Sequence, residues 1–318
     1  MAIVCRLMQC EDIPECAAIF AEHPLLAARY GETLSRLGEA WARVLGQLAF
    51  AAVVVEEANG ERYRKVALGT RVFVSDRFMA EMKTSPFCWI GPEIVRRILS
   101  GESPLLTDRQ VRENNSCGGV NLFAWDAAIC RSDFGRQEIV HALFGEFVEL
   151  HEGFLLKEFL SQSASSVEML DAQLRSGDLL LGEDGRYTGD APSMPLEELL
   201  RVPHYVGISR ELAERDYTWV TTLFAYRPPC FGLRPNEQRL LTLALNGLTD
   251  AELAERLGIS LSAVKKCWRR IYERIGAHSA DLMPDACKSE GTHGRGAMKK
   301  QRLLAYLRAH IEELRPIV

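Results

Sequence analysis

The stretch LTDAELAERLGISLSAVKKCWRRIYERI, residues 248–275, decides the fold of the C-terminal part of the chain. Thr249 and Glu252 have the spacing of a capping box, in which each side chain satisfies a backbone donor at the start of a helix. Gly258 is the residue type that most readily ends a helix, and Ser260 can cap the next one. The pattern therefore predicts a helix, a tight turn and a second helix.

The second of these helices, expected at about 261–275, has one apolar face and a strongly basic remainder. Its buried face should hold Val264, Ile271 and Ile275, with Cys267 or Trp268 filling the gap. The other faces carry the polar and cationic residues Ser262, Lys265, Lys266, Arg269, Arg270 and Arg274. This arrangement is typical of a recognition helix in the DNA major groove. The alternatives are that the basic residues form an ordinary solvated helix face, or that the C-terminal helices are a protein-interaction module.

Helical patterns flank this motif on both sides. Pro235 opens a helix that should stop at Asn246 and Gly247. After a Gly, Ser and Lys-rich piece at 288–300, which is predicted to be a mobile connection, the segment 298–316 places Leu303, Leu304, Leu307, Ile311 and Leu314 on one face. That face is expected either to pack on its own domain or to form a dimer contact.

The stretch EQRLLTLALNGLTDAELAERLGISLSAVKKCWRRIYERI, residues 237–275, resembles the C-terminal DNA-binding domain of LuxR-type (LuxR/FixJ) transcriptional regulators. The positions that match the family pattern are Glu237, Gly247, Thr249, Glu252, Leu253, Ala254, Leu257, Ser260, Val264 and Lys265. The departures are Arg234, Ala263 and Cys267, and Pro284 interrupts the fourth helix of the family. The resemblance implies a transcription regulator that binds double-stranded DNA as a homodimer, with Thr249, Ser262, Lys265, Lys266, Arg269 and Arg270 as DNA-binding residues.

The chain is too long for one hydrophobic core. With 318 residues, two domains are the expectation. Pro228 and Pro229 mark a connection. We therefore predict an α/β domain at 1–226, a linker at 227–233 and a small all-α helix-turn-helix domain at 234–318.

The N-terminal part alternates between strand and helix patterns. Strand-like runs flank Asn59 and Gly60 and predict an antiparallel hairpin. A helix is expected at 33–48, a polar loop at 114–119, a long helix at 135–151, a Ser-capped helix at 165–177 and a strand at 217–226. The order predicts a mixed, mostly antiparallel sheet covered by helices.

This order is similar to the fold of the GNAT superfamily of N-acetyltransferases. RLMQCEDIPECAAIF (6–20) resembles its opening strand and helix, and GFLLKEFLSQSASSVEMLDAQLRSGD (153–178) resembles a later strand and helix. The resemblance implies that acetyl-CoA, or another acyl-CoA, would bind at the start of the long helix, since a helix N-terminus attracts phosphate.

The sequence at that position departs from the pattern of the family. CRSDFGRQE (130–138) keeps Gly135 and the cations Arg131 and Arg136 as candidate cofactor residues, but their spacing differs and Asp133 adds a negative charge. We therefore expect a ligand sensor for a small-molecule effector, or a dimerisation scaffold, with no catalytic residue assigned. The alternative is an acetyl-CoA-dependent N-acetyltransferase with an appended helix-turn-helix.

Composition excludes several other classes of protein. The net charge of −5 argues against a protein that coats nucleic acid along its whole surface, although one basic face remains compatible with it. No run reaches the ~18 apolar residues of a membrane span, and the N-terminus does not resemble a signal peptide, so a cytoplasmic location is expected. The nine cysteines are scattered without metal-ligand spacing and should be reduced thiols rather than metal ligands.

Overall fold

The computed structural model describes residues 2–60, 62–84, 86–162, 167–189, 192, 194–215, 218, 220–279, 282 and 295–316. The chain forms two compact units. Unit 1 consists of Met1–His151 with Leu155–Ala225, and unit 2 consists of Glu152–Phe154 with Tyr226–Val318. Among the described residues, no helix has the length and hydropathy that crossing a bilayer requires.

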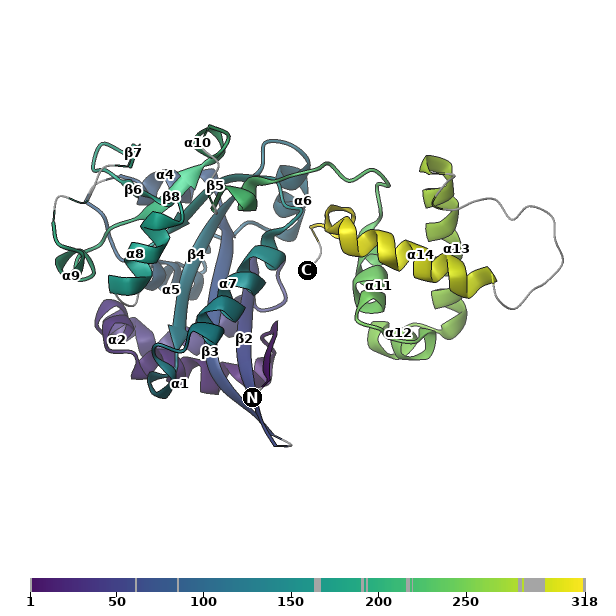
Figure 1. Cartoon of the computed structure of the whole chain (residues 1–318), viewed down its shortest axis with the longest axis horizontal. Helices are drawn as coiled ribbons and strands as arrows, with labels where there is room; N and C mark the ends of the chain where they lie inside the picture. Colours follow the sequence, from purple (N-terminus) through teal and green to yellow (C-terminus); the bar gives the residue numbers. More distant parts are fainter. Residues whose placement is uncertain are drawn as a thin grey trace. The chain divides into compact units, whose positions relative to one another are not determined.

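Unit 1 is built on one mixed sheet with the strand order β1-β2-β3-β4-β5-β8-β6-β7 (Figure 1). Its strands are β1 Ile3–Leu7, β2 Phe50–Asn59, β3 Arg62–Val74, β4 Val120–Ile129, β5 Leu156–Ser161, β6 Leu179–Leu181, β7 Tyr187–Thr188 and β8 Val206–Ser209. The pair β4 and β5 is parallel, and all the other pairs are antiparallel. The predicted α/β class with a mostly antiparallel sheet is confirmed.

The helices of unit 1 cover this sheet. The α-helices are α1 Ile13–Glu22, α2 Pro24–Tyr30, α3 Leu37–Val44, α4 Asp76–Met82, α5 Ile90–Ser100, α6 Asp108–Ser116, α7 Gln137–His151, α8 Val167–Arg175, α9 Leu196–Leu199 and α10 Arg210–Ala213. The 3-10 turns are η1 Cys10–Asp12, η2 Gly31–Arg36, η3 Arg131–Asp133 and η4 Val220–Phe224. Helix α7 crosses in front of the sheet in Figure 1, where Ile139 and Leu143 pack on Val55 and Ala67.

Two of the expectations for unit 1 were wrong in part, and a third falls on residues that the structure does not describe. The helix expected at 33–48 begins as the 3-10 turn η2 and ends at Val44. The loop expected at 114–119 is helical to Ser116, because Thr107 and Gln110 form a capping box that starts α6. The Ser cap expected before α8 falls at 163–166, outside the described residues.

The strand expected at 217–226 is instead η4 over its described part. Val220, Thr221, Leu223 and Phe224 are buried, as the pattern indicated, whereas Thr222 is exposed, and none of the five is paired in the sheet. The Thr221 hydroxyl accepts a hydrogen bond from Thr218 N and donates one to Thr218 O. Such local hydrogen bonds favour a tight turn rather than an extended strand. The short strand β8, which was not predicted, lies next to β5.

Unit 2 is all helical over its described residues. It contains α11 Pro235–Leu245, α12 Asp250–Leu257, α13 Leu261–His278, α14 Arg295–Ala309 and η5 Ile311–Leu314. Its core is formed by Leu240, Leu241, Leu253, Val264, Ile271, Ile275, Leu303, Leu307 and Leu314, all fully buried. Residues 295–300 belong to α14, so the mobile connection expected at 288–300 was wrong for that part. Residues 288–294 of that piece lie outside the described residues, and so does Pro284.

Candidate functional site

The turn between α12 and α13 has the local geometry that its residues predict. Thr249 Oγ1 accepts a hydrogen bond from Glu252 N at 3.3 Å, and Thr249 N donates to Glu252 Oε2 at 2.7 Å. Gly258 adopts the left-handed conformation, with φ of 64° and ψ of 33°. Ser260 Oγ then accepts from Ala263 N at 3.2 Å. The two helices are therefore joined by a three-residue connection capped on both sides.

The inner face of α13 is held in the core of unit 2. Val264, Trp268, Ile271 and Ile275 are each at most 5% exposed. Trp268 Nε1 donates to Asp250 Oδ1 at 3.2 Å across the two helices, which fixes α13 against α12.

Helix α14 also contacts the Asp250–Trp268 pair that joins α12 and α13. Lys300 Nζ lies 2.9 Å from the same Asp250 oxygen and 4.9 Å from the centre of the Trp268 ring. An ammonium in this position gains both from the carboxylate and from the face of the indole. The motif is therefore braced by a helix that is distant in sequence.

The outer face of α13 presents the predicted cations to solvent. Lys265, Lys266, Arg269 and Arg270 are all exposed, as is Ser262 near the start of the helix. Within the described residues, the only ion pair recorded for these four cations joins Arg269 Nε to Glu273 Oε1 at 3.8 Å. Their charge is thus available to an anionic partner.

Some sequence-predicted positions of the motif have structural roles. Arg274 is half-buried, and its Nε lies 3.2 Å from a carboxylate oxygen of Glu237. Glu237 also accepts from Arg234 N at 2.8 Å, so this residue ties α13 to the start of α11. Thr249 is exposed, but its hydroxyl is engaged in the capping box. Cys267 is half-buried against the core, and burial raises the pKa of its thiol, which makes it a poor nucleophile.

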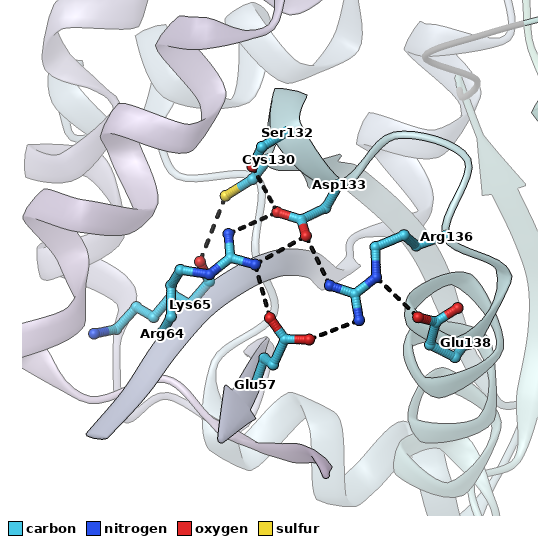
Figure 2. Close-up of polar contacts among 8 residues, drawn as sticks. All are labelled: Glu57, Arg64, Lys65, Cys130, Ser132, Asp133, Arg136 and Glu138. Carbon is cyan, nitrogen blue, oxygen red and sulfur yellow. Dashed lines mark hydrogen bonds and ion pairs between the residues drawn. The ribbon is translucent and has the colours of Figure 1, made fainter. Parts of the chain in front are cut away.

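The β4–α7 loop, where the sequence placed its weak cofactor candidates, is occupied by an ion-pair network (Figure 2). Arg64 forms two bonds to Asp133, at 2.7 and 2.9 Å, and a third to Glu57 at 2.8 Å. Arg136 bonds Asp133 at 2.8 Å, Glu57 at 2.7 Å and Glu138 at 2.8 Å. Each guanidinium bridges the two buried carboxylates, so the four side chains form a closed ring.

This ring changes what the loop can bind. The Arg64 guanidinium holds the pKa of Asp133 well below its usual range, so that carboxylate stays ionised. Arg136 has a carboxylate partner on each of its guanidinium nitrogens. Arg131 is exposed, and Gly135, with φ of +85°, lies in open space. The three candidates therefore do not assemble into a cationic cradle, and two carboxylates lie where a pyrophosphate would need positive charge.

Two acids in unit 1 whose pKa is raised by burial, one half-buried and one buried, were missed by sequence reasoning. The Asp126 carboxylate, on β4, accepts a hydrogen bond from the Tyr30 hydroxyl at 2.5 Å, and burial raises its pKa to about 6. Asp178, next to Gly177, is 6% exposed, and burial raises its pKa to about 7. An acid inside the apolar run VNLFAWDAAI was the available signal for Asp126.

All eight described cysteines are free thiols, and Cys287 lies outside the described residues. Within the same described part, no cluster of three or more potential ligands is placed to hold a metal ion. Comparison of the chain with protein-family models and with curated proteins gives no match.

Proposed function

We propose that this protein is a DNA-binding transcription regulator whose helix α13 reads the major groove of double-stranded DNA. The observation that carries the proposal is the outer face of α13. Four cations and Ser262 project from one rigid helix whose opposite face is fixed in a core. A LuxR-type helix-turn-helix, suggested by residues 237–275, supplies the same arrangement.

Charge and geometry assign different tasks to the residues of this face. Ser262 and Lys265 lie near the N-terminal end of α13, the part of a recognition helix that reaches base edges. Lys266, Arg269 and Arg270 provide phosphate contacts, which give most of the affinity and make it sensitive to salt. Thr249 contributes by capping α12, which crosses the backbone in such complexes.

Dimerisation is part of the proposal, because one small helical domain has too little interface for useful specificity. The apolar face of α14 packs inside unit 2, where Leu303 and Leu307 are fully buried together with Leu314 of η5. The dimer contact would therefore use another surface. Two copies would read half-sites related by two-fold symmetry.

For unit 1 we propose a GNAT-like architecture that serves as an effector sensor in the cytoplasm. The parallel pair β4 and β5, joined through α7, supports the architecture. The Arg64–Asp133–Arg136–Glu57 ring weighs against acyl-CoA binding at the start of α7. Acyl transfer is therefore not proposed.

The test is the retention of genomic DNA fragments by the purified full chain at low and moderate salt, followed by sequencing of the retained fragments. A recurring, two-fold-related site is the expected result. Retention that falls with salt but shows no recurring site would reduce the proposal to non-specific binding. The absence of retention at any salt would overturn it.

A further inference from the structure

Unit 1 contains a partly open cavity of about 100 Å³ between the sheet and its helices. Most of its wall is apolar, with Leu26, Val53, Leu143, Phe147, Phe159 and Leu223 among the lining residues. A dry, apolar cavity of similar size can hold a compact organic molecule such as a small aromatic ring. The space is therefore large enough for a small ligand and too small for a nucleotide cofactor.

Two residues that line this cavity carry hydrogen-bond acceptors for which the described residues supply no donor. They are Asp178 and Gln173. Among the described residues, neither Asp178 Oδ1 nor Gln173 Oε1 has a hydrogen-bond partner, although both atoms are buried. A buried acceptor left without a donor costs free energy, on the order of 1 to 3 kcal/mol. A ligand that brings donors to these two atoms would recover that cost.

The two acids that line the cavity, Asp126 and Asp178, differ in the charged and polar groups around them. Asp126 accepts a hydrogen bond from Tyr30, and the positive charge of Arg29 favours its ionised form. Burial raises the pKa of Asp178, and among the described residues no cation is recorded as lowering it. A cationic group would thus gain most beside Asp178.

The two arginines that line the cavity have other contacts. Arg29 donates to Leu200 O at 3.2 Å and lies over the Trp89 ring. Arg71 donates to Leu48 O at 3.0 Å and lies over the Phe73 ring.

We propose that this cavity is a binding site for a small amine, whose apolar body fills the space and whose ammonium group donates hydrogen bonds to Asp178 and Gln173. The binding itself does not depend on DNA recognition. The role of the amine as an effector rests on the proposed regulator function. In that role the amine stabilises unit 1 by binding the folded state alone.

The experiment uses the full chain and three ligands of similar shape: benzylamine, benzyl alcohol and benzoate. Calorimetric titration and thermal unfolding at pH 8 should show saturable binding of benzylamine, weaker binding of benzyl alcohol and none of benzoate. D178N should weaken benzylamine binding by about tenfold or more, since a charge-assisted bond is lost. D171N, on the same stretch of chain but outside the cavity lining, should leave it unchanged.

Three results would overturn the proposal: no saturable binding of benzylamine, benzoate binding as tightly as benzylamine, or unchanged affinity in D178N. Q173L provides a second variant that removes an acceptor without touching the charge, and it should also weaken binding. DNA retention is measured separately with and without benzylamine. If benzylamine binds without changing DNA retention, the effector role is refuted but the binding site is not. If the chain never retains DNA, the titration with benzylamine still tests the binding site by itself.

Discussion

Individual cations on α13 carry the DNA-binding proposal, and they differ in how freely their charge can be used. Lys265 and Arg270 are exposed, whereas Arg274 is turned inward to Glu237. Arg274 thus belongs to the fold of unit 2, although its sequence position suggested the same basic face. Under the DNA-binding proposal, the side chains expected to reach DNA are those whose helix positions point away from Val264 and Ile271.

The double variant Lys265→Ala with Arg269→Ala should lose at least about tenfold in affinity for genomic DNA. Each lost phosphate contact should also lower the slope of log affinity against log salt by ~0.9. Fluorescence anisotropy at several salt concentrations measures both effects. Arg239→Ala removes an exposed cation from α11 and serves as the matched control. An equal loss in the control would show that general charge is responsible and α13 is not.

Asp178 should make the stability of unit 1 depend on pH. Its folded pKa of about 7 lies above the ordinary value of 3.8, so the folded state holds the proton more tightly. Its contribution to stability is therefore full below pH ~4 and is lost as the pH rises through about 7.

D178N cannot ionise, so relative to the unmodified chain it should gain stability between pH 5 and 8. From 1.36 kcal/mol per pKa unit, the gain has an upper bound of ~4 kcal/mol. Urea unfolding across this pH range provides the measurement, with D171N as the control. A difference that stays constant with pH would mean that the carboxyl of Asp178 is not buried as described.

At the scale of elements, the α12–α13 turn shows how short-range signals set where α12 ends and α13 begins. Three capping interactions, at Thr249, Gly258 and Ser260, define where one helix ends and the next begins. An added Cβ at Gly258 would meet open space, so the requirement for glycine comes from its backbone conformation alone.

Gly258→Val should destabilise unit 2 by ~1 to 2 kcal/mol, because a β-branched residue is strained in the left-handed region. Gly258→Asn should cost much less, since Asn tolerates that region. Thermal unfolding monitored in unit 2 distinguishes the two variants. Equal costs would show that the turn does not need this conformation.

The β4–α7 loop is an element whose chemistry depends on strands elsewhere. The sequence predicted a negative charge at Asp133 and two cations nearby, but it did not show that Arg64 and Glu57 of the hairpin close a ring with them. The ring turns a candidate phosphate site into a neutral structural network. Its two carboxylates are buried whereas its guanidinium groups are partly exposed, so removing either arginine would leave a buried negative charge less well compensated.

At the scale of the whole molecule, unit 2 contains a helix that is far from the motif in sequence. Helix α14 supplies Leu303 and Leu307 to the core beneath α11 and α13. Two roles were expected for its apolar face, packing on its own domain or dimerisation. The structure shows the first, because Leu303 and Leu307 are buried inside unit 2. The motif at 248–275 does not form this core alone.

Leu307→Ala should cost ~2 to 5 kcal/mol by leaving a cavity in that core. It should raise hydrogen exchange in α11 and α13 and weaken DNA binding, although Leu307 is not on the recognition face. Arg308→Ala, at the next and exposed position, is the control and should behave like the unmodified chain. Unchanged exchange in Leu307→Ala would contradict the packing of α14.

Local sequence signals were enough to predict the two capped helices α12 and α13, the β2–β3 hairpin and the α/β class of unit 1. Caps, turn glycines and hydrophobic periodicity act over a few residues, so they can be recognised without knowing any tertiary contact. Tertiary structure alone decided that η4 is not a strand, that Arg274 faces inward, that the β4–α7 loop is closed by an ion-pair ring, and that Asp178 and Gln173 share a cavity with β2, β4 and α7. The physical reason is range: burial and charge pairing join residues that lie tens to more than a hundred positions apart, and no local pattern records which of them will meet.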